Sequence, residues 1–115
     1  MTSFAPVYEA LRAMMIAAAP KAVIASDSPG DLVLHATDID PKTGKPVWFG
    51  AVSIKRTYVA YHLFPLYSTP QLGHDLSPEL SRRRQGKSCF NFTKEEPVLF
   101  AELDRLTRKA AQPLG

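Results

Sequence analysis

Hydrophobic residues in the first twenty positions repeat with the period of an amphipathic helix. Those expected on its buried face are spaced by three, four and seven residues. They are Val7, Leu11, Met14, Met15 and Ala18. Proline lacks a backbone donor and clashes with the preceding helical turn, so Pro20 should end the helix. The pattern therefore predicts a helix over residues 5–19.

The next part of the chain consists of short runs rich in β-branched and aromatic residues, separated by turn residues. A turn is expected before residue 32, because Pro29 presets φ and Gly30 accepts a positive φ. The runs predict four strands in an antiparallel meander. They cover residues 22–26, 32–37, 47–54 and 58–64.

The last third of the chain predicts a loop, a short helix and a fifth strand. The loop covers residues 65–76, which contain two prolines. Ser77 and Pro78 suit the N-cap and the first position of a short helix, and Gly86 suits its end. The fifth strand covers residues 88–92.

A second long helix is expected at the end of the chain. Thr93 and Glu96 have the spacing of a capping box. The buried stripe of the helix is Leu99, Phe100, Leu103 and Leu106. The order helix, four strands, short helix, strand, helix predicts an α+β fold, in which the two long helices cover one face of an antiparallel sheet as an open-faced sandwich.

Composition narrows the class of protein. The chain has 115 residues, 45% of them hydrophobic, which suits a single domain over residues 1–115 with its own core. One cysteine, Cys89, cannot form an intramolecular disulfide, so we expect a cytoplasmic rather than a secreted protein. The apolar run at residues 13–19 is far shorter than the roughly 20 residues of a membrane span. The net charge of +3 permits contact with nucleic acid without requiring it.

Two stretches carry a family resemblance. They read FGAVSIKRTYVAYHLFPLY at residues 49–67 and LSPELSRRRQGKSCFNF at residues 76–92. Both resemble the YdhG-like family of small bacterial proteins of unknown function. The resemblance covers roughly residues 45–106, and the run Gly86–Phe92 is its most specific piece.

The YdhG-like proteins are similar in fold to frataxin, an open-faced sandwich with two helices on one side of an antiparallel sheet. The resemblance therefore implies the same architecture as the element order. Frataxins bind iron through an acidic ridge on the first helix and first strand. Here the first helix carries only Glu9, and no further acid precedes Asp27. The resemblance thus implies a fold more than it implies an activity.

Side chains alternate between the two faces of a strand, which predicts an inner and an outer face for the sheet. The inner face is expected to hold Trp48, Gly50, Val52, Ile54, Val59, Tyr61 and Leu63. The outer face is expected to hold His35, Phe49, Tyr58, His62, Phe64 and Cys89. The candidate ligand-binding residues on and around this outer face are His35, Lys55, Tyr58, His62, Phe64, Lys87 and Cys89.

Other chemistry has weaker support in the sequence. Cys89 could act as a nucleophile with His62 as its base, although a small packed cysteine is the commoner outcome. No cluster of His, Cys, Asp and Glu has metal-ligand spacing, and no cofactor is expected. The run Arg82–Arg84 suits a helix C-terminus, where cations are favoured, and could alternatively form an anion site with Lys55 and Arg56.

Three hypotheses for function remain open. The first is a non-enzymatic binding module, which presents the outer sheet face to a small ligand or a protein partner, including a second copy of the chain as a homodimer. The second is an iron-binding protein of frataxin type. The third is a weak binder of single-stranded nucleic acid, with aromatic residues on an open sheet and basic residues at its rim.

Overall fold

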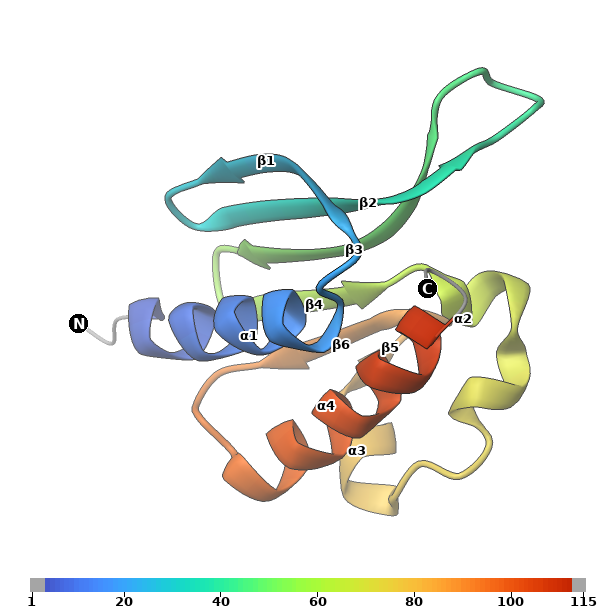
Figure 1. Ribbon diagram of the computed structural model, residues 1–115. Coiled ribbons are helices and arrows are strands. Elements are labelled where there is room, and N and C mark those ends of the chain that lie inside the picture. The colour runs from blue at the N-terminus through green and yellow to red at the C-terminus, as the bar shows by residue number, and fades with distance from the viewer. Residues whose placement is uncertain (1–3, 113–115) are drawn as a thin grey trace.

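The computed structural model describes residues 4–112 and is an α+β fold with one long helix near each end (Figure 1). In chain order, its elements are α1 (Ala5–Ala18), β1 (Val23–Ser28), β2 (Asp31–Ile39), β3 (Pro46–Ile54), β4 (Val59–Leu63), α2 (Pro65–Ser68), the 3-10 helix η1 (Pro70–Gly73), α3 (Pro78–Arg83), β5 (Arg84–Gln85), β6 (Cys89–Phe92) and α4 (Pro97–Ala111). The predicted fold class is confirmed. The short elements α2, η1 and β5 are additions to the predicted order.

The strands of the described chain form one sheet in the order β1-β2-β3-β4-β6-β5, and all neighbours are antiparallel. The first four strands make the predicted meander. The turn between β1 and β2 has Gly30 at φ +76°, a conformation that glycine adopts without a steric penalty. Strand β6 then lies beside β4, and β5 completes a hairpin with it.

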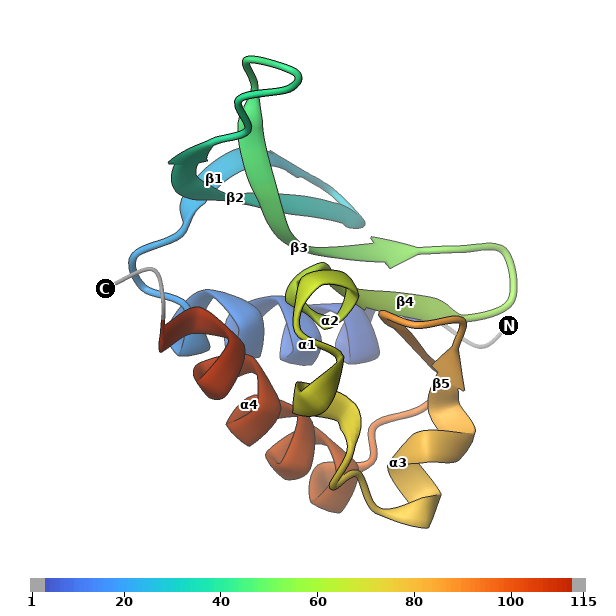
Figure 2. The same cartoon turned by 90° about the vertical axis from the view of Figure 1, so that its right-hand side faces the viewer.

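Helices α1 and α4 lie together on one face of the sheet (Figures 1 and 2). The core between the layers includes Leu11, Met15, Leu32, Leu34, Phe49, Val52, Val59, Tyr61, Leu63, Phe90, Phe92, Leu99, Leu103 and Leu106. The Tyr61 hydroxyl lies 2.6 Å from the Thr107 hydroxyl, which joins β4 to α4 by a buried hydrogen bond. Within residues 4–112, no helix combines the length and the apolar character that a membrane crossing requires.

The predicted alternation of faces is wrong in the first half of β3. Leu34 pairs with Gly50 but His35 pairs with Trp48, so Phe49 is an extra residue that forms a β-bulge. An extra residue moves every side chain beyond it to the opposite face. Phe49, predicted on the outer face, is therefore 1% exposed in the core, and Trp48, predicted in the core, is 49% exposed.

The N-cap prediction for the short helix is confirmed, since the Ser77 hydroxyl accepts a hydrogen bond from the Leu80 amide at 3.1 Å. The capping box predicted for the last helix is wrong. Glu96 itself is the N-cap of α4, and no side chain caps this end. Its carboxylate instead accepts two hydrogen bonds from Arg83 of α3, at 2.8 and 2.7 Å. A partner distant in the sequence thus replaces the local one.

Three smaller predictions are also wrong. The region 65–76 is not a plain loop, because Pro65 and Pro70 each begin a short helix, as the fixed φ of proline allows. Arg84 does not belong to the short helix, which ends at Arg83, but begins β5. Ile54 is exposed rather than buried, because it is the last residue of β3 and lies at the end of the sheet beside the turn at Gly30.

Candidate binding surface on the outer sheet face

The strand register places the candidate residues of the outer face in two neighbouring rows. One row crosses four strands, from Val33 through Ala51 and His62 to Cys89, each paired directly with the next. The other row contains the pair His35 and Trp48 and continues to Phe64, which follows β4. The Phe64 amide donates to the Phe49 carbonyl at 2.9 Å and so extends the contact between β3 and β4.

The aromatic rings of these rows form a continuous cluster, to which α2 adds one member. This aromatic cluster consists of His35, Trp48, His62, Phe64 and Tyr67. The ring centroids of His35 and Trp48 are 5.6 Å apart, and Trp48 meets Phe64 edge to face at 5.2 Å. The rings of His62 and Phe64 are nearly parallel, 4.3 Å apart and inclined by 6°.

Two members of the aromatic cluster are open to solvent. Trp48 is 49% exposed and Tyr67 is 55% exposed. Phe64 and His62 are half-buried between them. Tyr67 lies 6.4 Å from Phe64 and 6.2 Å from His62, measured between ring centroids. The cluster therefore has a partly buried interior and two exposed aromatic residues.

His62 is electrostatically distinct among the rings. Burial lowers the pKa of its imidazole, and the nearby positive charge of Lys55 lowers it further. Its Nε2 atom is buried without a hydrogen-bond partner in the described chain. The side chain is therefore a neutral imidazole at neutral pH, packed mainly as an aromatic ring.

Cys89 lies directly across from His62 on β6. Its thiol donates to Asn91 Oδ1 at 3.4 Å, and burial raises the pKa of the thiol, with Lys55 acting in the opposite direction. A nucleophilic cysteine needs a lowered pKa and a base that holds its proton. The environment here favours the neutral thiol, so the geometry supports a packed cysteine rather than a catalytic one.

The remaining candidates are more dispersed. Lys55 is exposed at the end of β3, and its charge reaches both His62 and Cys89. Tyr58 precedes β4 while Phe64 follows it, so the two lie about 20 Å apart along the strand. Lys87 is exposed in the turn between β5 and β6. Strands β3 and β4 lie between His35 on β2 and Cys89 on β6, so these two residues are about 14 Å apart across the strands.

Sequence reasoning missed two functional candidates, Trp48 and Tyr67. Trp48 was assigned to the core because the bulge at Phe49 leaves no mark in the alternation. Tyr67 lies in α2, within a region predicted as a loop. The spacing from Phe64 to Tyr67, three residues across a proline-initiated turn, is the signal that could have indicated their contact.

Two of the three arginines of the run form contacts within the protein. Arg83 donates two hydrogen bonds to the Glu96 carboxylate, and this pairing lowers the pKa of the Glu96 carboxyl. The Arg84 guanidinium donates to the Lys87 carbonyl, with Nε at 2.9 Å, and so closes the hairpin turn. Arg82 and Arg83 do lie in the last turn of α3, as the helix-dipole interpretation expects.

No metal centre is evident on this face or elsewhere in the described residues. Among residues 4–112, no group of three or more His, Cys, Asp and Glu side chains is placed to hold a metal ion.

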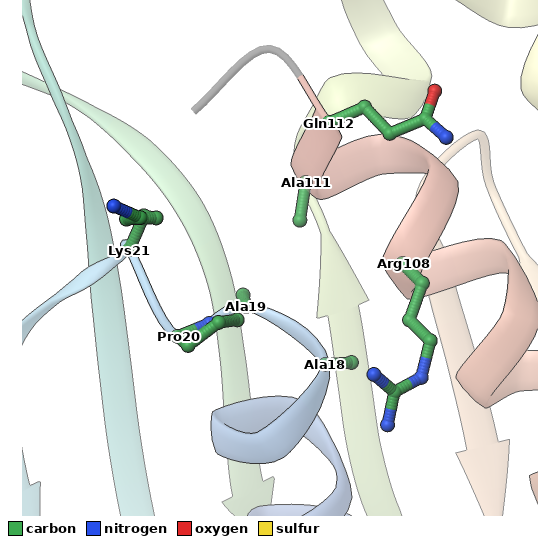
Figure 3. Close-up of a pocket in the computed structure, with 7 residues that line it drawn as sticks. All are labelled: Ala18, Ala19, Pro20, Lys21, Arg108, Ala111 and Gln112. Atoms are coloured by element: carbon green, nitrogen blue, oxygen red, sulfur yellow. The ribbon is translucent and has the colours of Figure 1, made fainter. Parts of the chain in front are cut away.

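A pocket of about 280 Å³ lies apart from this face, where the C-terminal ends of α1 and α4 approach each other (Figure 3). Its lining residues are Ala18, Ala19, Pro20, Lys21, Arg108, Ala111 and Gln112. Figure 3 shows Arg108 and Gln112 extending from α4, with Lys21 on the opposite side. Arg108 also bonds Asp104 at 3.0 Å, so this lining combines small apolar groups with one already paired cation.

Comparison with known proteins adds no relative, since no family model, no curated protein and no solved structure matches the chain.

Proposed function

We propose that this chain is a non-enzymatic binding module that takes a planar aromatic anion on its outer sheet face. The observation that carries the proposal is the aromatic cluster, whose rings are in continuous contact and whose outer members, Trp48 and Tyr67, are half-exposed. Such large apolar groups left together on a surface mark a binding site more often than isolated ones do.

The cluster is suited to stacking. Trp48 stacks with His35 and forms a T-shaped contact with Phe64, and Tyr67 lies beside Phe64 and His62. Aromatic side chains have only two χ angles, and these neighbours already restrict them, so little further entropy is lost on binding. A planar ligand gains dispersion and quadrupole contacts that water cannot provide.

Charge favours an anionic ligand. Burial is the larger cause of the pKa shifts of His62 and Cys89, but the positive charge of Lys55 adds to the lowering at His62 and opposes the raising at Cys89. Both groups therefore lie within the field of this cation. The chain as a whole carries a net charge of +3. A ligand with a carboxylate, sulfonate or phosphate beside its ring would match that positive charge.

The test uses 8-anilinonaphthalene-1-sulfonate as the probe. Trp48 is the one tryptophan of the chain, so quenching of its fluorescence reports on the site directly. Loss of one stacking partner should weaken binding about tenfold in Tyr67→Ala. The matched variant Tyr58→Ala, which removes a tyrosine at the far end of β4, should bind as the unmodified protein does. Equal affinity in both variants would contradict the proposal.

The charge component has its own control. N-phenyl-1-naphthylamine has the same rings without the sulfonate. We expect Lys55→Gln to weaken the sulfonate and to leave the uncharged probe unchanged, because only the former is attracted by the ammonium group. Equal losses for both probes would show that Lys55 acts through packing and not through charge.

A further inference from the structure

A small pocket lies between α4 and the segment that joins η1 to α3. Helix η1 is in contact with α4, and the segment continues from it to α3 (Figure 2). The pocket has a volume of about 230 Å³, and three leucines, two acidic residues and two basic residues line it. Sites for drug-sized ligands usually measure about 300–1,000 Å³, so this pocket suits a smaller molecule.

The apolar part of the lining belongs to the edge of the core. Leu106 of α4 is 5% exposed and is a member of the core. Leu72 and Leu76 are partly buried and pack against the core from the other side of the pocket. An aliphatic group placed among these three side chains would be removed from water, which favours its binding.

Two carboxylates of the lining come from segments that are joined by hydrogen bonds. Glu102 Oε2 accepts a hydrogen bond from the Ser77 amide at 2.8 Å, and its Oε1 accepts one from the Ser77 hydroxyl at 2.6 Å. Asp75 is two residues before Ser77, so their Cα atoms are at most about 8 Å apart. Asp75 is exposed and forms no ion pair with any residue from 4 to 112. This end of the pocket is therefore negative.

The two cations of the lining follow Glu102 along α4. Arg105 lies one turn farther on, about 4.5 Å along the helix axis, and Lys109 lies one turn beyond Arg105. Both side chains are exposed, and neither is part of an ion pair within the described chain. The pocket therefore has a positive end opposite its negative end, and the four charges sum to zero.

We propose that this pocket binds a free α-amino acid with an aliphatic side chain, of the size of leucine. Such a zwitterion carries an ammonium and a carboxylate on one carbon atom, which matches a pocket with two oppositely charged ends. Its carboxylate accepts hydrogen bonds from Arg105 and Lys109, its ammonium donates to Asp75, and its side chain contacts the leucines. A simple anion or cation of the same size is repelled at one end. The site is separate from the aromatic cluster.

The experiment titrates L-leucine into the isotope-labelled protein and follows the backbone amides by NMR. We expect saturable shifts at residues 72–76 and 102–109. Two analogues of the same chain length test the charges, because 4-methylpentanoate lacks the ammonium group and 3-methylbutylamine lacks the carboxylate. Each should bind about tenfold more weakly than leucine, since each loses one charge-assisted contact.

Variants at exposed positions test the two ends separately. Asp75→Asn should weaken leucine about tenfold and should not weaken 4-methylpentanoate, which has no ammonium group to lose. Arg105→Gln should weaken both. The matched control is Asp38→Asn, the same change at an exposed position of β2, and it should leave the binding of leucine unchanged.

Several results would overturn the proposal. One is the absence of saturable shifts up to the solubility limit of leucine. Another is equal affinity for leucine and 4-methylpentanoate, which would mean that the negative end of the pocket plays no part. Equal losses in Asp75→Asn and Asp38→Asn would have the same consequence, and shifts confined to the aromatic cluster would place leucine on the outer sheet face.

Discussion

Two adjacent aromatic residues of β3 have opposite roles because of the bulge at Phe49. Phe49 is enclosed in the core, so Phe49→Ala should cost about 3–5 kcal/mol of unfolding free energy. Trp48 is half-exposed and loses mainly ring contacts with His35 and Phe64, so Trp48→Ala should cost only about 1 kcal/mol. Urea denaturation followed by circular dichroism measures both. A larger cost for Trp48 would mean that β3 lacks the bulge and has the alternation its sequence predicts.

His62 should make the protein less stable in mild acid. Its pKa is lowered in the folded state, so below about pH 6.5 the unfolded chain binds a proton that the folded chain resists. Stability should therefore fall as the pH is lowered from about 7 to about 5, a range mostly above the titration of carboxylates. Urea denaturation at both values should show a smaller fall in His62→Gln.

The control for this prediction is His74→Gln, because His74 is exposed just after η1. That variant should keep the full dependence on pH. If it removes the acid destabilisation and His62→Gln does not, the burial of His62 is not its cause.

At the residue scale, alternation predicted part of the outer face. It succeeded along β4, where Val59, Tyr61 and Leu63 are buried in regular register. It failed at Trp48 and Phe49, because a bulge is a property of the pairing of two strands and leaves no trace in the period of one. For that reason the alternation did not predict that Trp48 is exposed in the candidate site.

At the scale of elements, the packing of α1 on the sheet depends on Gly50. A Cβ atom at this position would lie 2.7 Å from Met15 Cε and 3.0 Å from the His62 carbonyl oxygen, both closer than van der Waals contact allows. Gly50→Ala should therefore cost about 1–3 kcal/mol, as overpacked cores do. The loss should be smaller when measured in a Met15→Ala background, where the removed side chain leaves room.

This double-variant comparison uses chemical denaturation of four proteins. The same cost of Gly50→Ala in both backgrounds would contradict a contact between α1 and β3 at this point. The cost would then come from the contact of the added Cβ with the His62 carbonyl oxygen of β4 instead.

The sequence predicted the start of a helix correctly where the capping contact is made by a neighbouring residue. Ser77 caps α3 with its own side chain, which the sequence indicates directly. Glu96 has the correct spacing from Thr93 for a capping box, but it pairs with Arg83, 13 residues away, in two hydrogen bonds. A bidentate arginine contact outweighs a single local bond. No local pattern indicates which arginine will lie near α4.

At the scale of the whole molecule, the sheet has one covered face, one open face and one open edge. The α+β order followed from the spacing of apolar residues, and the structure confirms it. The YdhG-like resemblance stays a prediction, and so do the iron-binding and nucleic-acid alternatives. The open face carries the proposed ligand site.

The most direct test of the binding proposal is a heteronuclear NMR titration of the isotope-labelled protein with 8-anilinonaphthalene-1-sulfonate. The proposal predicts shifts of the Trp48 indole N–H and of the backbone amides of residues 62–64, 66 and 67, with little change in α1 and α4. Shifts confined to the pocket of Figure 3, around Lys21 and Arg108, would contradict it, because a sulfonate would then be bound by cations at the helix ends and not by the aromatic cluster.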